Sequence, residues 1–175
     1  MTRVLAEDTR RTVVLMDHLG LRVPLVSLHE HNEAARTDQA LAWLGAGEDL
    51  ALVSDAGTPL VSDPGERLVR AAADTGHKVV PLPGPSAVLT ALVSSGLASD
   101  SFVFLGFAPR RGRERSRLLD RVAGSEETVV LFESPERVDS LLADLASACG
   151  EERRVAVARE LTKVHEEVVR GTLAE

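Results

Sequence analysis

The stretch at residues 54–65 constrains the fold most, because it joins an apolar run to a helical pattern through a long polar turn. Residues 50–53 are apolar and predict a buried strand, while Leu68, Val69 and Ala72 have the spacing of a helix face. The turn is therefore expected at the carboxyl end of a strand, where open α/β sheets bind ligands. Its glycines let the backbone approach a ligand, and its aspartates supply hydrogen-bond acceptors. A well-capped connection that binds nothing is the alternative.

Composition favours a soluble globular protein of one domain or two small ones, since 175 residues with 44% hydrophobic content can form a core. The net charge of -7 means that any nucleic-acid contact must come from a local basic patch. Cys149 is the only cysteine, which excludes an internal disulfide framework and fits a reducing cytoplasm. No apolar run is long enough to span a bilayer, and no secretory signal opens the sequence. A cytoplasmic protein without membrane contact is expected.

The first part of the chain predicts two more strand ends that carry polar residues. Residues 4–6 predict the end of a strand, and Thr9 is the expected N-cap of a helix that ends at Gly20. Residues 21–28 predict a second strand, which delivers the sequence His-Glu-His-Asn-Glu at 29–33. Histidines two positions apart do not fit the helical zinc motif. The cluster either caps the helix that follows it or lines a substrate cleft.

A second loop rich in glycine and proline follows. Residues 66–76 predict a helix, and residues 78–82 predict a short strand. The sequence Pro-Gly-Pro-Ser-Ala at 83–87 then begins an apolar helix, where Ser86 suits either a plain N-cap or contact with a ligand carboxylate or ribose oxygen. A change of composition near residues 97–100 predicts a linker between two lobes.

An arginine-rich run follows the first strand expected in the second lobe, at residues 102–105. Residues 110–121 hold six arginines and two acidic residues, although the chain as a whole is acidic. Such a run can neutralise phosphates and is the best local candidate for contact with RNA. A solvated helix face of mixed charge has the same pattern.

Two further strand ends complete the sequence pattern. Residues 128–132 predict a strand that ends in an acidic loop at 133–136, and residues 155–158 lead into a charged segment. In that segment Arg159 and Glu160 either pair with each other or face a substrate. No dinucleotide fingerprint, P-loop, nucleophile elbow or zinc spacing is present. The polar loops at successive strand ends therefore predict a small-molecule or cofactor site in a cleft.

Six motifs in one order carry a family resemblance that covers nearly the whole chain. They lie at residues 6–10, 29–33, 54–65, 83–87, 132–137 and 158–163. Together they resemble the ribosomal RNA small subunit methyltransferase I family, which is the 16S rRNA cytidine 2'-O-methyltransferase branch of the tetrapyrrole methylase superfamily.

The resemblance implies a two-lobed α/β fold with S-adenosyl-L-methionine in the cleft between the lobes, and a homodimer. The first lobe, residues 1–98, is expected to hold a mainly parallel sheet, and the second, residues 99–175, a mixed sheet. The family usually begins with a strand and a Thr-Pro-Ile-Gly-Asn loop and continues past the end of this sequence. The first strand of one lobe and the last strands of the other are therefore expected to be missing.

The resemblance also implies a reaction and its site residues. A methyl group would pass from the cofactor to the 2'-oxygen of a cytidine in 16S rRNA or the small ribosomal subunit, without a metal. The implied cofactor contacts are Asp55, Ala56, Gly57, Thr58, Ser86, Ala87, Phe132, Glu133, Ser134, Ala158 and Arg159. The candidate general bases are Glu7, Asp8, His31 and Glu133, and the candidate RNA contacts are Arg10, Arg110, Arg111, Arg113, Arg115 and Lys163.

Other assignments fit parts of the same pattern. A tetrapyrrole C-methyltransferase or a diphthine synthase would share the cofactor lobe, but the arginine run and the residues 29–33 favour RNA. A non-catalytic cofactor-binding or RNA-binding module is an alternative from another class. For Glu7 and Asp8, the alternative to a role as general base is that they only cap a helix.

Overall fold

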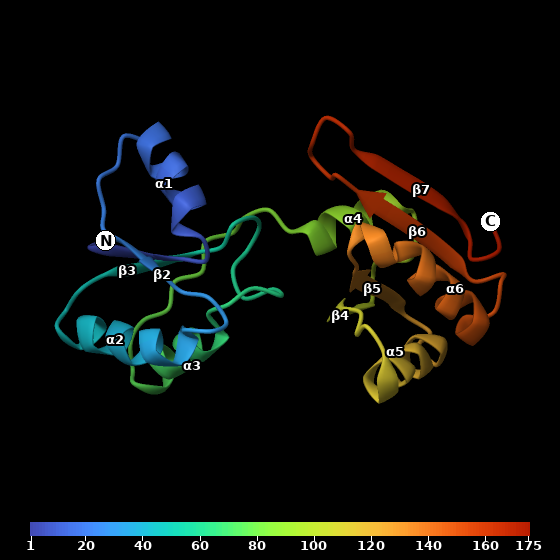
Figure 1. The fold of residues 1–175 in the computed structure, drawn as a ribbon, viewed down its shortest axis with the longest axis horizontal. Coiled ribbons are helices and arrows are strands. Elements are labelled where there is room, and N and C mark those ends of the chain that lie inside the picture. Colours follow the sequence, from blue (N-terminus) through green and yellow to red (C-terminus); the bar gives the residue numbers. More distant parts are fainter. The chain divides into compact units, whose positions relative to one another are not determined.

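The computed structural model describes all residues 1–175, and their contacts divide the chain into two compact units, Met1–Pro85 and Ser86–Glu175. Figure 1 labels the elements of both units. The division falls earlier than the boundary expected after residue 98. Helix α4 (Ala87–Ser95) belongs to the second unit because it packs against strand β6 (Arg154–Arg159) of that unit.

The first unit is built on a three-stranded parallel sheet with the strand order β2-β1-β3. Its strands are β1 (Arg3–Ala6), β2 (Leu25–Ser27) and β3 (Leu50–Val53). The central strand β1 is buried, as parallel strands covered on both faces usually are: Val4 and Leu5 are each 1% exposed. The parallel sheet expected in the first lobe is confirmed, although β2 is shorter than the strand expected at residues 21–28.

Three helices cover this sheet, namely α1 (Thr9–His18), α2 (Glu33–Gly45) and α3 (Glu66–Asp74). Helices α2 and α3 pack together on one face, and α1 lies on the other (Figure 1). The core under α2 and α3 consists of Leu5, Leu28, Ala40 and Leu68, with Trp43 packed against it.

Two local predictions for this unit were wrong. The N-cap of α1 is Asp8 rather than Thr9, because the Asp8 carboxylate accepts a hydrogen bond from the Arg10 main-chain N–H at 2.9 Å. Residues 78–82 do not form a strand, because their main chain has no neighbouring strand to pair with. Within that segment the side chains of Val80 and Leu82 are 60% and 81% exposed.

The second unit holds two two-stranded sheets of different types. Strands β4 (Phe102–Phe107) and β5 (Thr128–Phe132) are parallel, whereas β6 and β7 (Glu167–Thr172) are antiparallel. The expected mixture of strand directions is present, but in two separate sheets. The helices of this unit are α4, α5 (Gly112–Ala123) and α6 (Val138–Cys149), with one turn of 3-10 helix at Pro135–Arg137. Ala108, Val122, Leu141 and Leu145 form its core.

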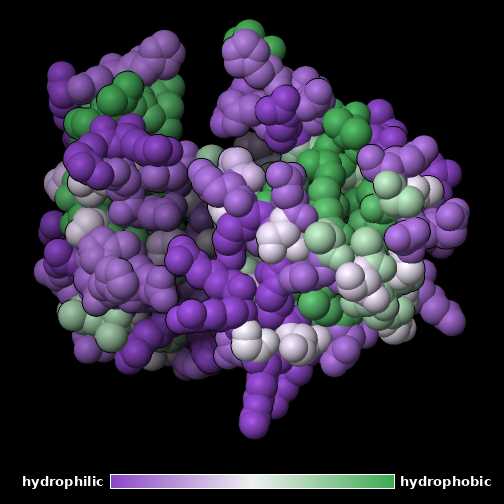
Figure 2. Space-filling view, turned by 45° about the vertical axis from the view of Figure 1, so that its right-hand side comes forward, coloured by the Kyte–Doolittle hydropathy of each residue, from purple (hydrophilic) through white to green (hydrophobic).

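Hydrophobic side chains reach the surface of both units. Figure 2 shows a largely hydrophilic face with hydrophobic patches between the polar side chains. The most exposed large hydrophobic residues include Val14 on α1, Leu82, and Val93 on α4, at 67%, 81% and 77%. None of the helices combines the length and the apolar character needed to cross a membrane.

Candidate functional site

The carboxyl ends of β1, β2 and β3 lie at one edge of the parallel sheet, where ligands of such sheets bind. The loops after β1 and β3 are joined there by two reciprocal contacts. The main-chain N–H of Asp8 donates to Asp55 Oδ1 at 3.2 Å, and the main-chain N–H of Asp55 donates to Glu7 Oε2 at 3.3 Å. Glu7, Asp8 and Asp55, which the sequence analysis assigned separately, therefore belong to one cluster.

Two arginines of α1 neutralise this acidic cluster. Arg10 Nη2 lies 2.7 Å from Asp8 Oδ2, and Arg11 Nε lies 3.3 Å from Asp55 Oδ2. The guanidinium of Arg10, with its main-chain N–H, lowers the pKa of Asp8 to about 2. A carboxylate with so low a pKa is a poor general base at neutral pH. Sequence reasoning missed Arg11, because its partner Asp55 is distant in sequence.

Asp63, at the far end of the loop 54–65, has a raised pKa, whereas that of Asp8 is lowered. Burial raises the pKa of Asp63, the charge of Asp55 raises it further, and hydrogen bonding from Ser54 opposes both effects. Asp63, one of the acceptors expected in this loop, is a titratable group of this edge outside the implied set of cofactor contacts.

The loop 54–65 has strained backbone and free main-chain donors. Leu60 and Ser62 have φ values of 74° and 67°, a region that costs a non-glycine residue about 1 kcal/mol or more and that is common at ligand sites. The N–H groups of residues 56–58 make no hydrogen bond within the protein. Thr58 Oγ1 donates to the carbonyl oxygen of Pro85 at 3.1 Å, so two of the predicted loops contact each other.

The residues 29–33 have mainly a structural role. Asn32 Oδ1 accepts from the His29 main-chain N–H at 2.9 Å, which closes the loop after β2. Glu33 Oε1 accepts from the main-chain N–H groups of Gly65 and Arg67, both at 3.0 Å. The cluster therefore caps α3 rather than the helix that follows it in sequence. His31 remains exposed, with its ring centroid 6.0 Å from that of His29.

In the second unit the loop after β5 contains a buried carboxylate. The Glu133 side chain is 4% exposed and pairs with Arg137, and Glu133 Oε1 accepts from the Ser134 main-chain N–H at 2.7 Å. Glu133 Oε2 is buried and has no partner. Phe132 packs edge to face on Phe104, with ring centroids 4.9 Å apart. Sequence reasoning did not assign Arg137 to the site, although its position four residues after Glu133 is a usual spacing for an ion pair.

The remaining candidate cofactor contacts of this unit lie at element ends. Ser86 is the N-cap of α4, where its hydroxyl accepts from the Leu89 main-chain N–H at 3.4 Å, and Ala87 is exposed in the first turn. Ala158 and Arg159 end β6. Arg159 pairs with Glu167 at 2.5 Å, so the pairing considered between Arg159 and Glu160 does not occur.

The arginine-rich run forms α5 and the turn before it. Arg115 is 12% exposed, lies 2.6 Å from Asp144 Oδ2 and donates to the Pro109 carbonyl oxygen, so it fastens α5 to α6. The other arginines of the run are exposed and form no ion pair: Arg110, Arg111, Arg113, Arg117 and Arg121. Of the other predicted RNA contacts, Arg10 pairs with Asp8, and Lys163 lies 3.0 Å from Glu160 Oε1. Five arginines without an ion pair therefore lie within the twelve residues 110–121, on α5 and the turn before it.

Acid titration should distinguish the two aspartates of the first-unit edge. The Asp8 carboxyl is expected to titrate at a pKa of about 2, and Asp63 above the ordinary aspartate value of 3.8. Because the pKa of Asp8 falls on folding, its contribution to stability is complete above its unfolded pKa and disappears as the pH falls to about 2. Carbon-13 NMR of the carboxyl groups measures both values.

Two arginine variants test the cause of the low Asp8 pKa, one at its partner and one as a control. Arg10→Gln should raise the pKa of Asp8 toward 3.8 and leave Asp63 unchanged. Arg22→Gln removes an exposed partner of Asp17 and should leave both unchanged. An unchanged Asp8 in Arg10→Gln would show that Arg10 does not set its pKa.

Comparison with known proteins extends over nearly the whole chain. The chain is 49% identical over 170 residues to the Ribosomal RNA small subunit methyltransferase I of Synechocystis sp., covering 97% of this chain and 61% of that protein. The protein of the same name from Xylella fastidiosa is 48% identical, with 99% and 64% covered, and that from Bacillus subtilis is 44% identical, with 98% and 59% covered. The resemblance carried by the six motifs is confirmed. The chain spans less than two thirds of the length of these relatives.

A solved structure and a family model agree with this result. The crystal structure of the methyltransferase CobJ superposes with a TM-score of 0.68 over 99% of this chain and 87% of that one; at 18% identity this likeness shows the fold alone. Residues 2–175 match the family model described as Tetrapyrrole (Corrin/Porphyrin) Methylases, and the chain therefore belongs to this family.

Proposed function

We propose that this chain acts as an S-adenosyl-L-methionine-dependent methyltransferase on the 2'-hydroxyl of a cytidine ribose in 16S rRNA. The identity of 49% to a relative named as a small-subunit rRNA methyltransferase carries the proposal. The exposed, unpaired arginines of α5 support it, because such charges bind phosphate groups of RNA. The resemblance further implies a cytoplasmic homodimer, and sedimentation of the purified chain at two concentrations tests the dimer.

The residues present fit the proposed cofactor. S-adenosyl-L-methionine has a carboxylate and ring nitrogens that accept hydrogen bonds, and the N–H groups of Ala56, Gly57 and Thr58 have no protein acceptor. Its amino and hydroxyl groups donate hydrogen bonds, and Glu133 Oε2 is a buried acceptor without a donor. When bound, the cofactor supplies an electrophilic methyl group on its sulfonium. We propose the eleven cofactor contacts implied by the resemblance as its site, with these two groups as the best supported.

The chain's own residues would orient the substrate and remove the hydroxyl proton. Among the proposed bases, Asp8 is disfavoured by its pKa of about 2, and Glu7 is occupied by the Asp55 N–H. Glu133 is held by Arg137 and Ser134, which suits a fixed binding group better than a mobile base. His31 is exposed, and an imidazole can accept a proton at neutral pH, so we propose it as the first base to test.

Calorimetry with S-adenosyl-L-methionine tests the cofactor site. Gly57→Ala should weaken binding at least about tenfold, because Gly57 has a φ of 76°, which strains an alanine, and relief of this strain would move the free N–H groups of residues 56–58. Gly76→Ala is the matched control, since Gly76 has a similar φ of 81° but is not among the proposed cofactor contacts. Both variants should lose about 1 kcal/mol of stability, but only the first should lose affinity. No binding by the unmodified chain at millimolar cofactor would refute the proposal for residues 1–175.

Filter binding to small-subunit RNA tests the arginines of α5. The double variant Arg111→Glu and Arg113→Glu should bind the RNA about tenfold more weakly. The decrease of its affinity with rising salt concentration should be less steep, by the amount expected for the loss of about two phosphate contacts. Arg22→Glu with Arg70→Glu, on the first unit, makes the same change of net charge at exposed residues and should leave binding nearly unchanged. Equal losses in both double variants would mean that net charge rather than α5 governs binding. Nucleoside mass spectrometry of treated RNA for 2'-O-methylcytidine tests the reaction itself.

A further inference from the structure

Three of the four phenylalanines of the chain pack together at the end of β4, in the second unit. The ring of Phe132 on β5 contacts the rings of Phe104 and Phe107 on β4, with centroids 4.9 Å and 5.4 Å apart. Phe104 and Phe132 are partly buried, whereas Phe107 is 57% exposed. The Phe107 ring is therefore held by an aromatic neighbour and still offers much of its surface to solvent.

A bulge in β4 gives Phe107 this position. Phe104 pairs with Val130 and Phe107 pairs with Phe132, so β4 has an extra residue between these two pairs. Gly106 lies in the bulge with a φ of 68°, which glycine adopts at little cost. In a regular strand, residues three apart face opposite sides, but the bulge lets both Phe104 and Phe107 contact Phe132. Bulges often lie beside functional sites, because they redirect a side chain.

Arginines without an ion pair begin directly after this ring. Arg110 and Arg111 are exposed, and the Cα atom of Arg111 lies within about 14 Å of that of Phe107, because four residues of extended chain span no more. Three further exposed arginines follow on α5 at intervals of four residues: Arg113, Arg117 and Arg121. Side chains at this interval lie along one side of a helix, with a repeat of about 6 Å. The exposed ring is thus followed by a row of positive charges.

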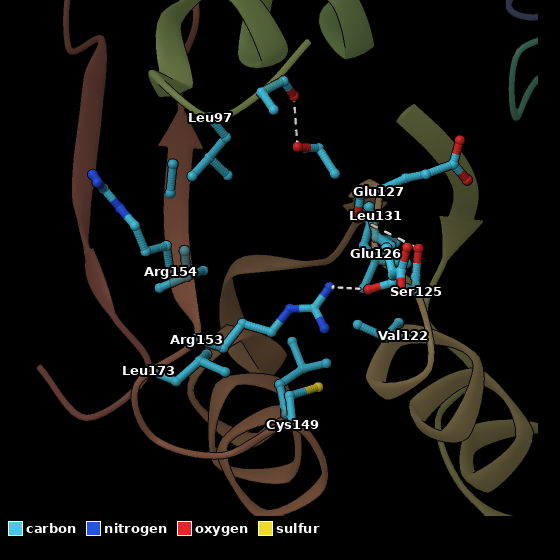
Figure 3. A pocket seen from close by; sticks show the side chains of 16 residues that line it. Leu97, Val122, Ser125, Glu126, Glu127, Leu131, Cys149, Arg153, Arg154 and Leu173 are labelled. Atoms are coloured by element: carbon cyan, nitrogen blue, oxygen red, sulfur yellow. Dashed lines mark hydrogen bonds between the residues drawn. The ribbon is translucent and has the colours of Figure 1, made fainter. Parts of the chain in front are cut away.

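The opposite side of α5 is anchored in the unit. Near its beginning, Arg115 pairs with Asp144 of α6 at 2.6 Å. Near its end, Val122 is 6% exposed and belongs to the core. Figure 3 shows the Arg153 side chain extending to Ser125, which follows the helix, and the Arg153 guanidinium donates to the Ser125 carbonyl oxygen at 3.1 Å. The row of arginines lies on the side of α5 turned away from Val122, so the anchored helix presents these charges to solvent.

We propose that this surface binds an unpaired segment of RNA, with one base stacked on the Phe107 ring and neighbouring phosphates on the arginines of residues 110–121. The inference rests on the proposed function in taking RNA as the partner, and it adds a stacking residue and the single-stranded state of the bound segment. An arginine row alone would fit paired and unpaired RNA equally. A fixed, exposed aromatic ring favours the unpaired form, because the bases of a duplex are stacked on one another and only an unpaired base offers its face.

Fluorescence anisotropy with three labelled probes tests the stacking. The probes are a single strand of twelve cytidines, an RNA duplex of twelve base pairs, and a strand of twelve riboses that carry no base. Phe107→Leu keeps an apolar side chain but removes the ring, so it should weaken binding of the cytidine strand about tenfold and leave the other two probes unchanged. Phe107→Tyr keeps a ring and should retain the affinity. Arg117→Gln with Arg121→Gln should weaken binding of all three probes, because each of them carries phosphates.

A tryptophan at the same position gives an independent signal, because the second unit holds no tryptophan of its own. In Phe107→Trp, the cytidine strand should quench the added emission, and the strand without bases should not. Equal effects of Phe107→Leu on all three probes, or no effect on the cytidine strand, would overturn the inference. A tenfold loss of S-adenosyl-L-methionine affinity in Phe107→Leu would assign the ring to the cofactor and also overturn it. The proposed methyl transfer would survive each of these failures, since binding of small-subunit RNA and nucleoside analysis test it separately.

Discussion

Replacing Leu28 with alanine is expected to lower the free energy of unfolding of the first unit by about 3 kcal/mol. Leu28 is 0% exposed and packs with Leu5, Ala40 and Leu68. Truncation removes apolar surface from this core and leaves a cavity, and both effects destabilise the folded state. The Leu28 main-chain N–H, which donates to Ala6 at 2.8 Å, stays in place, so the loss would report the side chain.

Urea denaturation followed by tryptophan fluorescence measures this loss in the correct unit. Trp43 is the only tryptophan and packs against the same core, so its signal reports unfolding of the first unit. Leu15→Ala is the control, because Leu15 of α1 is 51% exposed and its truncation should cost less than about 0.5 kcal/mol. Similar losses in both variants would contradict the packing described around Leu28.

Removing Arg137 is expected to be the most damaging single change near the loop after β5. Arg137→Met leaves the Glu133 carboxylate, 4% exposed, without its counter-ion. Breaking a fully buried ion pair costs about 3–5 kcal/mol; because Arg137 is itself 28% exposed, water can partly replace it, and about 2 kcal/mol is expected. Adding Glu133→Gln should recover part of the loss, since a neutral amide needs no counter-ion.

Hydrogen exchange of the β5 amides measures this effect, because the second unit holds no tryptophan. Arg70→Met is the matched control: Arg70 forms an ion pair of the same spacing with Glu66, but both side chains are exposed, at 69% and 72%. An exposed pair is worth less than about 1 kcal/mol, so this control should change little. If the stability losses of Glu133→Gln and Arg137→Met simply added up in the double variant, the two residues would not act as a pair.

The local pattern of apolar and polar residues was sufficient to predict most strands and helices. The apolar run before the loop 54–65 is β3, and the two earlier apolar runs are β1 and β2 of the same parallel sheet. The side-chain periodicity of a strand or a helix is written in neighbouring residues, which is why these elements could be predicted. The segment 78–82 shows the limit, because an apolar run becomes a strand only when another strand pairs with it.

Site residues were predicted less completely, because their roles depend on residues distant in sequence. Glu33 looked like part of a cap for its own helix, but it holds the first turn of α3, more than 30 residues away. Arg115 looked like one more RNA contact, but Asp144 fastens it to α6. Neither partner could be identified from spacing, since both contacts exist only after helices from different parts of the chain pack together.

The sequence by itself determined the family and the loops that form the candidate site, because the motifs are contiguous and each follows an apolar run. Only the tertiary structure decided which charges are free. It neutralises Asp8 and Asp55 with arginines of α1, buries Glu133 with one oxygen unpartnered, and leaves five arginines of the α5 run unpaired. The physical reason is that ion pairing and burial depend on distance in space, and the fold alone brings these side chains together.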